Sequence, residues 1–286
     1  MVITVTGSTG TIGAELVRLL SAAGAPTRAV FRNPDRVQRL ASVVWAQADL
    51  ADRRILEPTI AGTTRLFLLG DNNPGFGQIQ IDVVRAAQEL GVSHVVKLSA
   101  LGASAHSNSS IAREHWSVEQ ALQASTMTWT LLRPHAFMQN WLGDVAESVR
   151  TRDVIDSPIG DGQVPFIDTR DIAAVAAEAL LHAEAHANAK HFLTGAEAVG
   201  MADLAAVLSE TTGKPVTYRP ISMDEARARL EAQGIASVTI DATLAIAAYQ
   251  KAGGPTSKVS DKVERILGRA PRTIRDFARD YRSHFA

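Results

Sequence analysis

The sequence predicts an α/β fold in which helices cover both faces of a doubly wound parallel sheet, with a small α+β lobe near the C-terminus. Two observations lead to this fold class. Six short apolar segments alternate with amphipathic helical segments in the first half of the chain, and a glycine-rich turn joins the first strand to the first helix. The alternation implies right-handed crossovers. In such open sheets, ligands bind at the carboxyl ends of the strands.

The turn after the first strand carries the clearest functional signal. A β-branched run over residues 2–6 predicts a buried strand, and residues 14–23 show the apolar stripe of a helix. The intervening glycines permit, in order, a tight turn, close approach of a pyrophosphate, and close packing of the helix on the strand. The N–H groups at the start of the helix favour phosphates. In the alternative interpretation, a plain turn, the glycines serve packing alone. We predict a Rossmann-like dinucleotide site at Gly7, Thr9, Gly10, Thr11, Ile12 and Gly13.

The end of the second strand, predicted over residues 28–31, indicates which dinucleotide binds. An Asp or Glu about 20 residues beyond the glycine turn would hold the ribose 2′-hydroxyl of NAD. This sequence has Arg32 there instead, with Arg36 one turn later. A guanidinium suits a 2′-phosphate in charge and geometry, so NADP(H) is favoured over NAD(H). The alternative is that Arg32 is a solvated residue at a strand end.

Later strand ends supply further candidates for the cofactor site. Asp49 follows the third strand, residues 43–46, where it either accepts from the adenine amine or caps the next helix. An apolar run over residues 65–70 predicts a central strand, so Leu69 and Gly70 are expected beside the cofactor. Asp71 begins a loop, residues 71–77, that is either a rim over the pocket or only a connection.

The last strands of the sheet bring titratable groups to the same edge. Ser99 ends the strand predicted over residues 95–99, and the helix over residues 113–124 carries His115 and Glu119 one turn apart. Pro134 ends the pairing of the sixth strand, residues 127–132, because it lacks an N–H.

From residue 153 the texture of the sequence changes, and residues 155–162 are rich in turn-forming residues. We predict a dinucleotide domain over residues 1–155, to which residues 164–196 return, and a substrate lobe over residues 197–286. The returning part contains a short strand at 164–167, a helix from residue 168 through 181 and another strand at 191–193. The remaining elements are a strand at 216–219 and helices at 201–211, 224–233, 239–251 and 263–284.

Composition excludes several classes of function. The formal net charge is −1, which gives no basic field for nucleic acid or an anionic membrane. No apolar run is long enough to span a bilayer, and the N-terminus enters the first strand directly, without the pattern of a signal peptide. The absence of cysteine rules out disulfides and thiolate sites, and fits a cytoplasmic protein. The eight histidines show no metal-binding spacing, so we predict no metal; a monomer and a homodimer are both left open.

Several motifs together resemble the NmrA-like, atypical branch of the extended short-chain dehydrogenase/reductase superfamily. The sequence is similar to the type 2 NAD(P)H:quinone reductases and triphenylmethane-dye reductases of that branch. The resemblance implies that the segment 133–135 borders the nicotinamide and that a substrate cleft lies between the sheet edge and the C-terminal lobe. The motifs lie at residues 6–13, 30–34, 97–102, 129–140, 166–173, 193–198 and 267–272.

One departure from the wider superfamily bears on the chemistry. Its reductases use a Tyr-x-x-x-Lys pair to protonate a carbonyl, but here the helix holds no Tyr, and His115 stands at the position of the Lys. A quinone or another conjugated acceptor takes up hydride without a strong general acid, so such an acceptor is favoured. His115 is then either a proton donor, a ligand of the ribose, or a buried polar residue. Ser99 either binds substrate or ribose, or caps the strand.

The predicted function is therefore an oxidoreductase that passes hydride from NADPH to a small conjugated molecule, with His115 and Ser99 as the catalytic candidates. The alternatives are a non-catalytic NAD(P)-binding redox sensor and a carbonyl or imine reductase of secondary metabolism. Candidate substrate-binding residues are Asp71, His135, Phe137, Met138 and Trp141, although aromatic and Met side chains near a strand exit more often belong to the core.

Overall fold

The computed structural model describes residues 1–37, 40–73 and 75–286; residue 74, within the predicted loop 71–77, lies outside this description, as do residues 38 and 39. The described chain forms two compact units. Unit 1 comprises Met1–Pro134 and Thr169–Leu193, and unit 2 comprises His135–Asp168 and Thr194–Ala286. The boundaries differ from those expected from the sequence, because residues 135–155, 164–168 and 194–196 group with the C-terminal part.

Unit 1 is built on a seven-stranded sheet in the order β3-β2-β1-β4-β5-β6-β8, in which every neighbouring pair is parallel. This arrangement confirms the doubly wound α/β fold. The strand order reverses between β1 and β4, and a ligand crevice is expected at such a switch point. The strands are β1 (Ile3–Val5), β2 (Thr27–Phe31), β3 (Val43–Gln47), β4 (Arg65–Leu68), β5 (His94–Leu98), β6 (Thr128–Pro134) and β8 (Ala189–Leu193).

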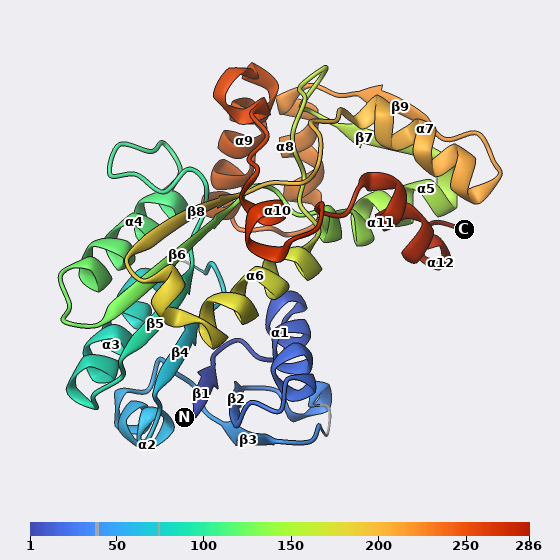
Figure 1. Cartoon of the computed structure of the whole chain (residues 1–286). Coiled ribbons are helices and arrows are strands. Elements are labelled where there is room, and N and C mark those ends of the chain that lie inside the picture. The colour runs from blue at the N-terminus through green and yellow to red at the C-terminus, as the bar shows by residue number, and fades with distance from the viewer. Residues whose placement is uncertain (38–39, 74) are drawn as a thin grey trace. The chain divides into compact units, whose positions relative to one another are not determined.

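Helices cover both faces of this sheet (Figure 1). One face carries α1 (Thr11–Ala22) and α6 (Thr169–Leu181), which pack on each other. The other carries α3 (Phe76–Glu89) and α4 (Ser110–Gln123). Shorter helical segments are α2 (Leu56–Ile60) and the 3-10 turns Pro34–Arg36, Arg53–Ile55 and Ala183–His186.

The apolar core beneath α3 and α4 gives way to polar side chains at the carboxyl end of the sheet. Leu68, Val95 and Leu131 are fully buried there together with Leu122 of α4. Side chains two residues apart on a strand share a face. Continuing along β5 from Val95 therefore brings the side chain of Lys97 under α4, near the carboxyl end of the sheet. The apolar core thus becomes polar where a ligand is expected.

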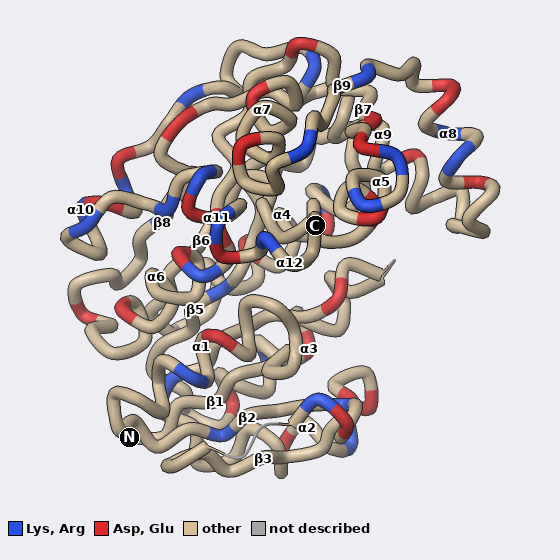
Figure 2. Tube along the Cα trace, turned by 90° about the vertical axis from the view of Figure 1, so that its right-hand side faces the viewer, with Lys and Arg blue, Asp and Glu red and all other residues tan. Residues whose placement is uncertain are grey.

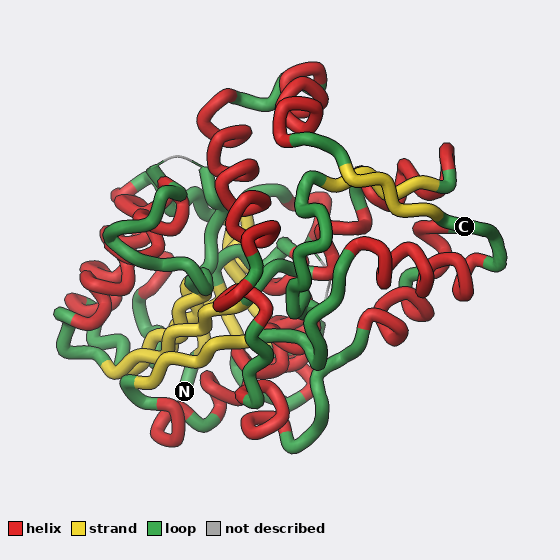
Figure 3. Tube along the Cα trace, turned by 90° about the horizontal axis from the view of Figure 1, so that it is seen from above, coloured by secondary structure: helices red, strands yellow, loops and turns green. Residues whose placement is uncertain are grey.

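Unit 2 contains a two-stranded parallel sheet of β7 (Val154–Ser157) and β9 (Thr217–Pro220), whose strands lie side by side in Figure 3. Helices α5 (Asp144–Arg152) and α7 (Met201–Thr212) pack against it. The other helices are α8 (Met223–Ala232), α9 (Ser237–Ala252), α10 (Lys262–Leu267), α11 (Ile274–Asp280) and α12 (Arg282–Phe285), with 3-10 turns at Met138–Leu142 and Gly254–Ser257.

Three expectations for this unit were wrong. Residues 164–167 form only isolated bridges, from Val164 to Val199 and from Ile167 to Phe137, rather than a strand. The turn-rich segment after residue 153 contains β7, which the pairing with β9 stabilises. The helix expected over 263–284 is three helices, because Gly268 ends α10 in the left-handed conformation and Thr273 caps the start of α11.

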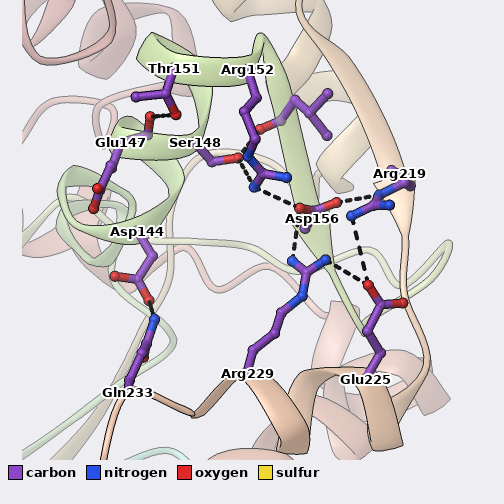
Figure 4. Close-up of polar contacts among 11 residues, drawn as sticks. Asp144, Glu147, Ser148, Thr151, Arg152, Asp156, Arg219, Glu225, Arg229 and Gln233 are labelled. Carbon is purple, nitrogen blue, oxygen red and sulfur yellow. Dashed lines mark hydrogen bonds and ion pairs between the residues drawn. The ribbon is translucent and has the colours of Figure 1, made fainter.

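A charged cluster joins α5, β7, β9 and α8 in unit 2 (Figure 4). The carboxylate of Asp156, which is 5% exposed, accepts hydrogen bonds from Arg219 at 2.6 Å and from Arg152 and Arg229 at 2.8 Å each. The guanidinium groups, foremost that of Arg219, hold the pKa of Asp156 well below its ordinary value. Elsewhere the charges of both signs are interspersed along the chain (Figure 2).

Asp156→Ala is expected to lower the free energy of unfolding by about 2 kcal/mol at pH 7, because three arginines lose their shared acceptor. Since the folded pKa of Asp156 is depressed, its contribution is present above the unfolded value of about 4 and is lost as the pH falls below it. Urea unfolding of wild type and variant at several pH values from 7 downwards should show that the difference between their free energies of unfolding becomes smaller. Asp241→Ala, which removes an exposed ion pair with Arg227, should cost at most about 1 kcal/mol at any pH.

Candidate functional site

The glycine turn between β1 and α1 has two glycines that the protein itself requires. Gly7 has a φ of +62°, and a Cβ there would lie 2.9 Å from Cγ of Leu69. A Cβ on Gly13 would lie 2.1 Å from the carbonyl oxygen of Gly7, so no side chain fits. Gly10 is different, because its φ of −81° is open to any residue and a Cβ would meet only the oxygen of Gly7, at 3.4 Å. Packing therefore does not explain the glycine at position 10, whereas close approach of a ligand does.

The turn is held rigidly against the strands beside it. The Ser8 hydroxyl donates to the carbonyl of Val30 at 2.7 Å. The Thr6 hydroxyl donates to the carbonyl of Leu69 at 2.6 Å and accepts from its N–H at 2.8 Å, which joins the ends of β1 and β4. This places the turn at the strand-order reversal.

Helix α1 begins at Thr11 without a side-chain cap, so the N–H groups of its first turn have no acceptor within the helix. Thr11 is exposed at this end, Thr9 is half-buried, and Ile12 packs into the core. The geometry fits a pyrophosphate bound by backbone N–H groups.

The two arginines expected at the ribose both lie on the surface. The Arg32 guanidinium pairs with the carboxylate of Asp71, and the two side chains are 62% and 53% exposed. This pair places Asp71 beside Arg32, at the end of β2. Arg36 lies exposed in the 3-10 turn that follows. Asp49 is exposed and accepts from the N–H of Ala51 at 3.1 Å, as a local cap does.

A buried ionic network lies beneath α4. Glu119 is fully buried and receives both the Nε and Nη2 of Arg133, the former at 2.8 Å, in a fork-like pair. The Ser99 hydroxyl donates to Glu119 at 2.5 Å. Ser99 and Arg133 thus share the Glu119 carboxylate as their acceptor, a connection that the sequence did not predict. The sequence places Ser99 and Arg133 at strand ends. That β5, β6 and α4 bring them together at Glu119 follows only from the three-dimensional fold.

His115 is in contact with a residue that sequence reasoning missed. Nδ1 of His115 lies 3.2 Å from Nζ of Lys97, and the ring packs on Phe76 with centroids 4.8 Å apart. Burial, aided by the charges of Lys97 and Arg133, lowers the pKa of His115 well below its ordinary value. Burial also lowers the pKa of Lys97 to about 7, with Glu119 acting in the opposite direction. A lysine in an otherwise apolar strand, two residues before Ser99, was the available signal.

The end of β4 carries another buried polar group. A Cβ on Gly70 would lie 3.3 Å from Nε2 of Gln80 on α3. Gln80 is 4% exposed, and its Oε1 has no hydrogen-bond partner within the part of the chain that the structure describes. An unsatisfied buried acceptor beside Leu69 and Gly70 is compatible with a ligand group at this strand end. At the end of β6, the carbonyl of Pro134 accepts from Leu101 at 3.1 Å.

The remaining substrate candidates lie in unit 2. Met138 and Trp141 are buried in its core, where Trp141 packs on Phe166 with centroids 4.7 Å apart. Phe137 is half-buried and its backbone bridges Ile167. His135 is 7% exposed, its Nδ1 accepts from the N–H of Ala136, and burial lowers its pKa to about 4. Packing thus accounts for Met138 and Trp141 without a ligand, while His135 keeps a buried Nε2 that has no partner among the described residues.

Among residues 1–37, 40–73 and 75–286, no group of three His, Cys, Asp or Glu side chains is placed to hold a metal ion. None of the helices in these same ranges has the length and apolar character needed to cross a bilayer.

Comparisons with known proteins give a consistent result. The sequence pattern of the NmrA-like family matches residues 1–278. An NAD(P)H azoreductase of Xenophilus azovorans is 35% identical, and a (4-alkanoyl-5-oxo-2,5-dihydrofuran-3-yl)methyl phosphate reductase of Streptomyces griseus is 34% identical, each match covering 99% of both chains. The crystal structure of an NADPH-dependent quinone oxidoreductase of Escherichia coli in complex with NADPH superposes with a TM-score of 0.85 at 27% identity. That match covers 96% of this chain and 98% of the other.

Proposed function

Because this chain belongs to the NmrA-like family, we propose that it is an NADPH-dependent reductase that transfers hydride to a quinone-like, azo or otherwise conjugated small molecule. The observation that carries the proposal is the glycine turn at the strand-order reversal, where Gly10 is required by no packing contact. The similarity to an azoreductase and to a quinone oxidoreductase supports the class of acceptor.

The residues proposed to hold the cofactor share one edge of unit 1. The glycine turn and the first turn of α1 bind the pyrophosphate, and Arg32 binds the 2′-phosphate. When bound, the cofactor supplies the hydride. Helix α4 contains no tyrosine, because the three tyrosines of the chain are Tyr218, Tyr249 and Tyr281. The chain is thus proposed to act without the Tyr-x-x-x-Lys pair, which favours acceptors that delocalise the incoming charge.

The test is NADPH oxidation in the presence of quinones, azo dyes, triphenylmethane dyes and aliphatic ketones. We expect turnover with the conjugated acceptors and little with the ketones. Tight NADPH binding without turnover on any acceptor would contradict the reductase and support the redox-sensor alternative. Turnover restricted to ketones or imines would favour the alternative reductase of secondary metabolism.

Arg32→Ala is expected to weaken NADPH binding by about tenfold to a hundredfold, because a charge-assisted bond to the 2′-phosphate is lost. NADH lacks that phosphate, so its affinity should change little. Titration of each nucleotide by calorimetry gives the two dissociation constants. The matched variant is Arg18→Ala, an exposed arginine of α1 paired with Glu15, which should affect neither nucleotide. An equal loss for both nucleotides would refute the role of Arg32.

A further inference from the structure

A lysine is buried near the carboxyl end of β5 in unit 1. The side chain of Lys97 on β5 is fully buried, yet it forms no ion pair with a carboxylate among the residues that the structure describes. Its ammonium donates instead to the carbonyl of Leu98 and faces Nδ1 of His115 at 3.2 Å. Burying an ammonium without an ion pair is costly, and the cost makes its proton leave more easily.

The groups around Lys97 determine that its proton is donated towards His115. His115 and Glu119 face it from α4, and Arg133 adds its charge from β6. His115 is neutral at pH 7, so its Nδ1 accepts from Lys97 and its own proton lies on Nε2. The ring is 5% exposed, and among the described residues its hydrogen bond is made by Nδ1 to Lys97. With Nδ1 turned to Lys97, Nε2 is the ring nitrogen from which a proton can pass to a ligand.

We propose that Lys97 and His115 form a proton relay that completes the reduction of a quinone-like or azo acceptor. This inference rests on the proposed reductase function. An acceptor that has taken up a hydride gains two electrons and needs one further proton on its anionic oxygen or nitrogen. Nε2 of His115 gives that proton, and Nδ1 takes one from Nζ of Lys97. The imidazole ends neutral in its other tautomer, and Lys97 ends as a neutral amine.

The relay returns to its starting state with protons from solvent. A proton enters at Nε2, and the proton on Nδ1 returns to Nζ of Lys97, so no charge accumulates. Lys97 acts only through His115. In this arrangement the two residues take over the proton supply that a Tyr-x-x-x-Lys pair provides elsewhere.

Comparing two classes of acceptor distinguishes a role of Lys97 in proton supply from a role in cofactor binding or folding. A quinone needs a proton after hydride uptake, whereas a cationic triphenylmethane dye becomes neutral on hydride uptake and needs none. Lys97→Met keeps the length of the side chain. It should slow quinone reduction roughly a hundredfold while the dye rate stays within about twofold. The wild-type quinone rate should fall as the pH rises through about 7, where Lys97 loses its proton, and the variant should lack this limb.

Lys190→Met, the same change at an exposed position of β8, should alter neither rate. An equal loss on both acceptors in the Lys97→Met variant would overturn the relay and leave Lys97 a purely structural residue.

A second measurement needs neither cofactor nor acceptor. NMR of the free protein should show Lys97 titrating at a pH of about 7 and the His115 ring responding to the same step. Unfolded lysine keeps its proton to about pH 10.4. The unfolded state thus binds more protons between about pH 7 and 10, and stability rises with pH in that window. Relative to Lys97→Met, the wild-type unfolding constant should fall by up to about tenfold per pH unit there.

A Lys97 that titrates near its ordinary pKa, or a His115 ring that ignores the step, would overturn the proposed relay. If no acceptor is reduced at all, the proposed function fails, and this titration still decides whether the proton pair exists.

Discussion

Gly13→Ala is expected to lower the free energy of unfolding by about 1–3 kcal/mol and to remove tight NADPH binding. A Cβ at this position would lie 2.1 Å from the carbonyl oxygen and 2.8 Å from the carbonyl carbon of Gly7, so backbone rather than a flexible side chain has to move. The start of α1 would then shift away from the end of β1, and the N–H groups that bind the pyrophosphate would move with it. Urea unfolding and NADPH titration measure the two effects.

Gly10→Ala is the matched variant, and it should separate the two effects. Its backbone is open to alanine and the new methyl group meets no protein atom closer than 3.4 Å, so stability should stay within about 0.5 kcal/mol of wild type. NADPH affinity should nevertheless fall by at least about tenfold, because the methyl group occupies the space through which the pyrophosphate approaches. Unchanged affinity would show that the phosphates do not lie against this residue.

Much of the fold of unit 1 could be predicted because its signals are local. Buried parallel strands are short β-branched runs, and each is followed by a helix of different period, so the first six strands were expected within about two residues of their observed bounds. In unit 2 the local signals fail. β7 is a strand only because β9 pairs with it, and the last helices are divided by the left-handed Gly268 inside an otherwise amphipathic pattern.

The site divides in the same way. The glycine turn and Arg32 are read from spacing along one βαβ unit, and the structure places them at the strand ends as expected. The pairing of Arg32 with Asp71 joins residues 39 positions apart, and that of Lys97 with His115 joins a strand to a helix. No periodicity encodes such pairs. A charged residue inside an apolar strand indicates that the fold must supply a polar partner, but the sequence does not identify which residue that partner is.

Glu119→Gln is expected to lower the free energy of unfolding by about 3–5 kcal/mol. The carboxylate is fully buried and is the shared acceptor of the Arg133 guanidinium and the Ser99 hydroxyl. An amide of the same shape carries no charge and turns an N–H₂ group towards Arg133, so the buried guanidinium is left unpaired. Urea unfolding measures the loss. Glu89→Gln, an exposed position on the neighbouring helix α3, should cost no more than about 0.5 kcal/mol.

A double variant identifies the origin of that cost. Replacing both partners by apolar residues of similar volume, Glu119→Leu with Arg133→Met, removes the unpaired charge together with its partner. Its stability should therefore recover most of the loss of the single variant, since buried ion pairs exchanged for well-packed apolar groups are often neutral. A double variant as unstable as Glu119→Gln would show that the pair itself, rather than the stranded charge, stabilises the carboxyl end of β6.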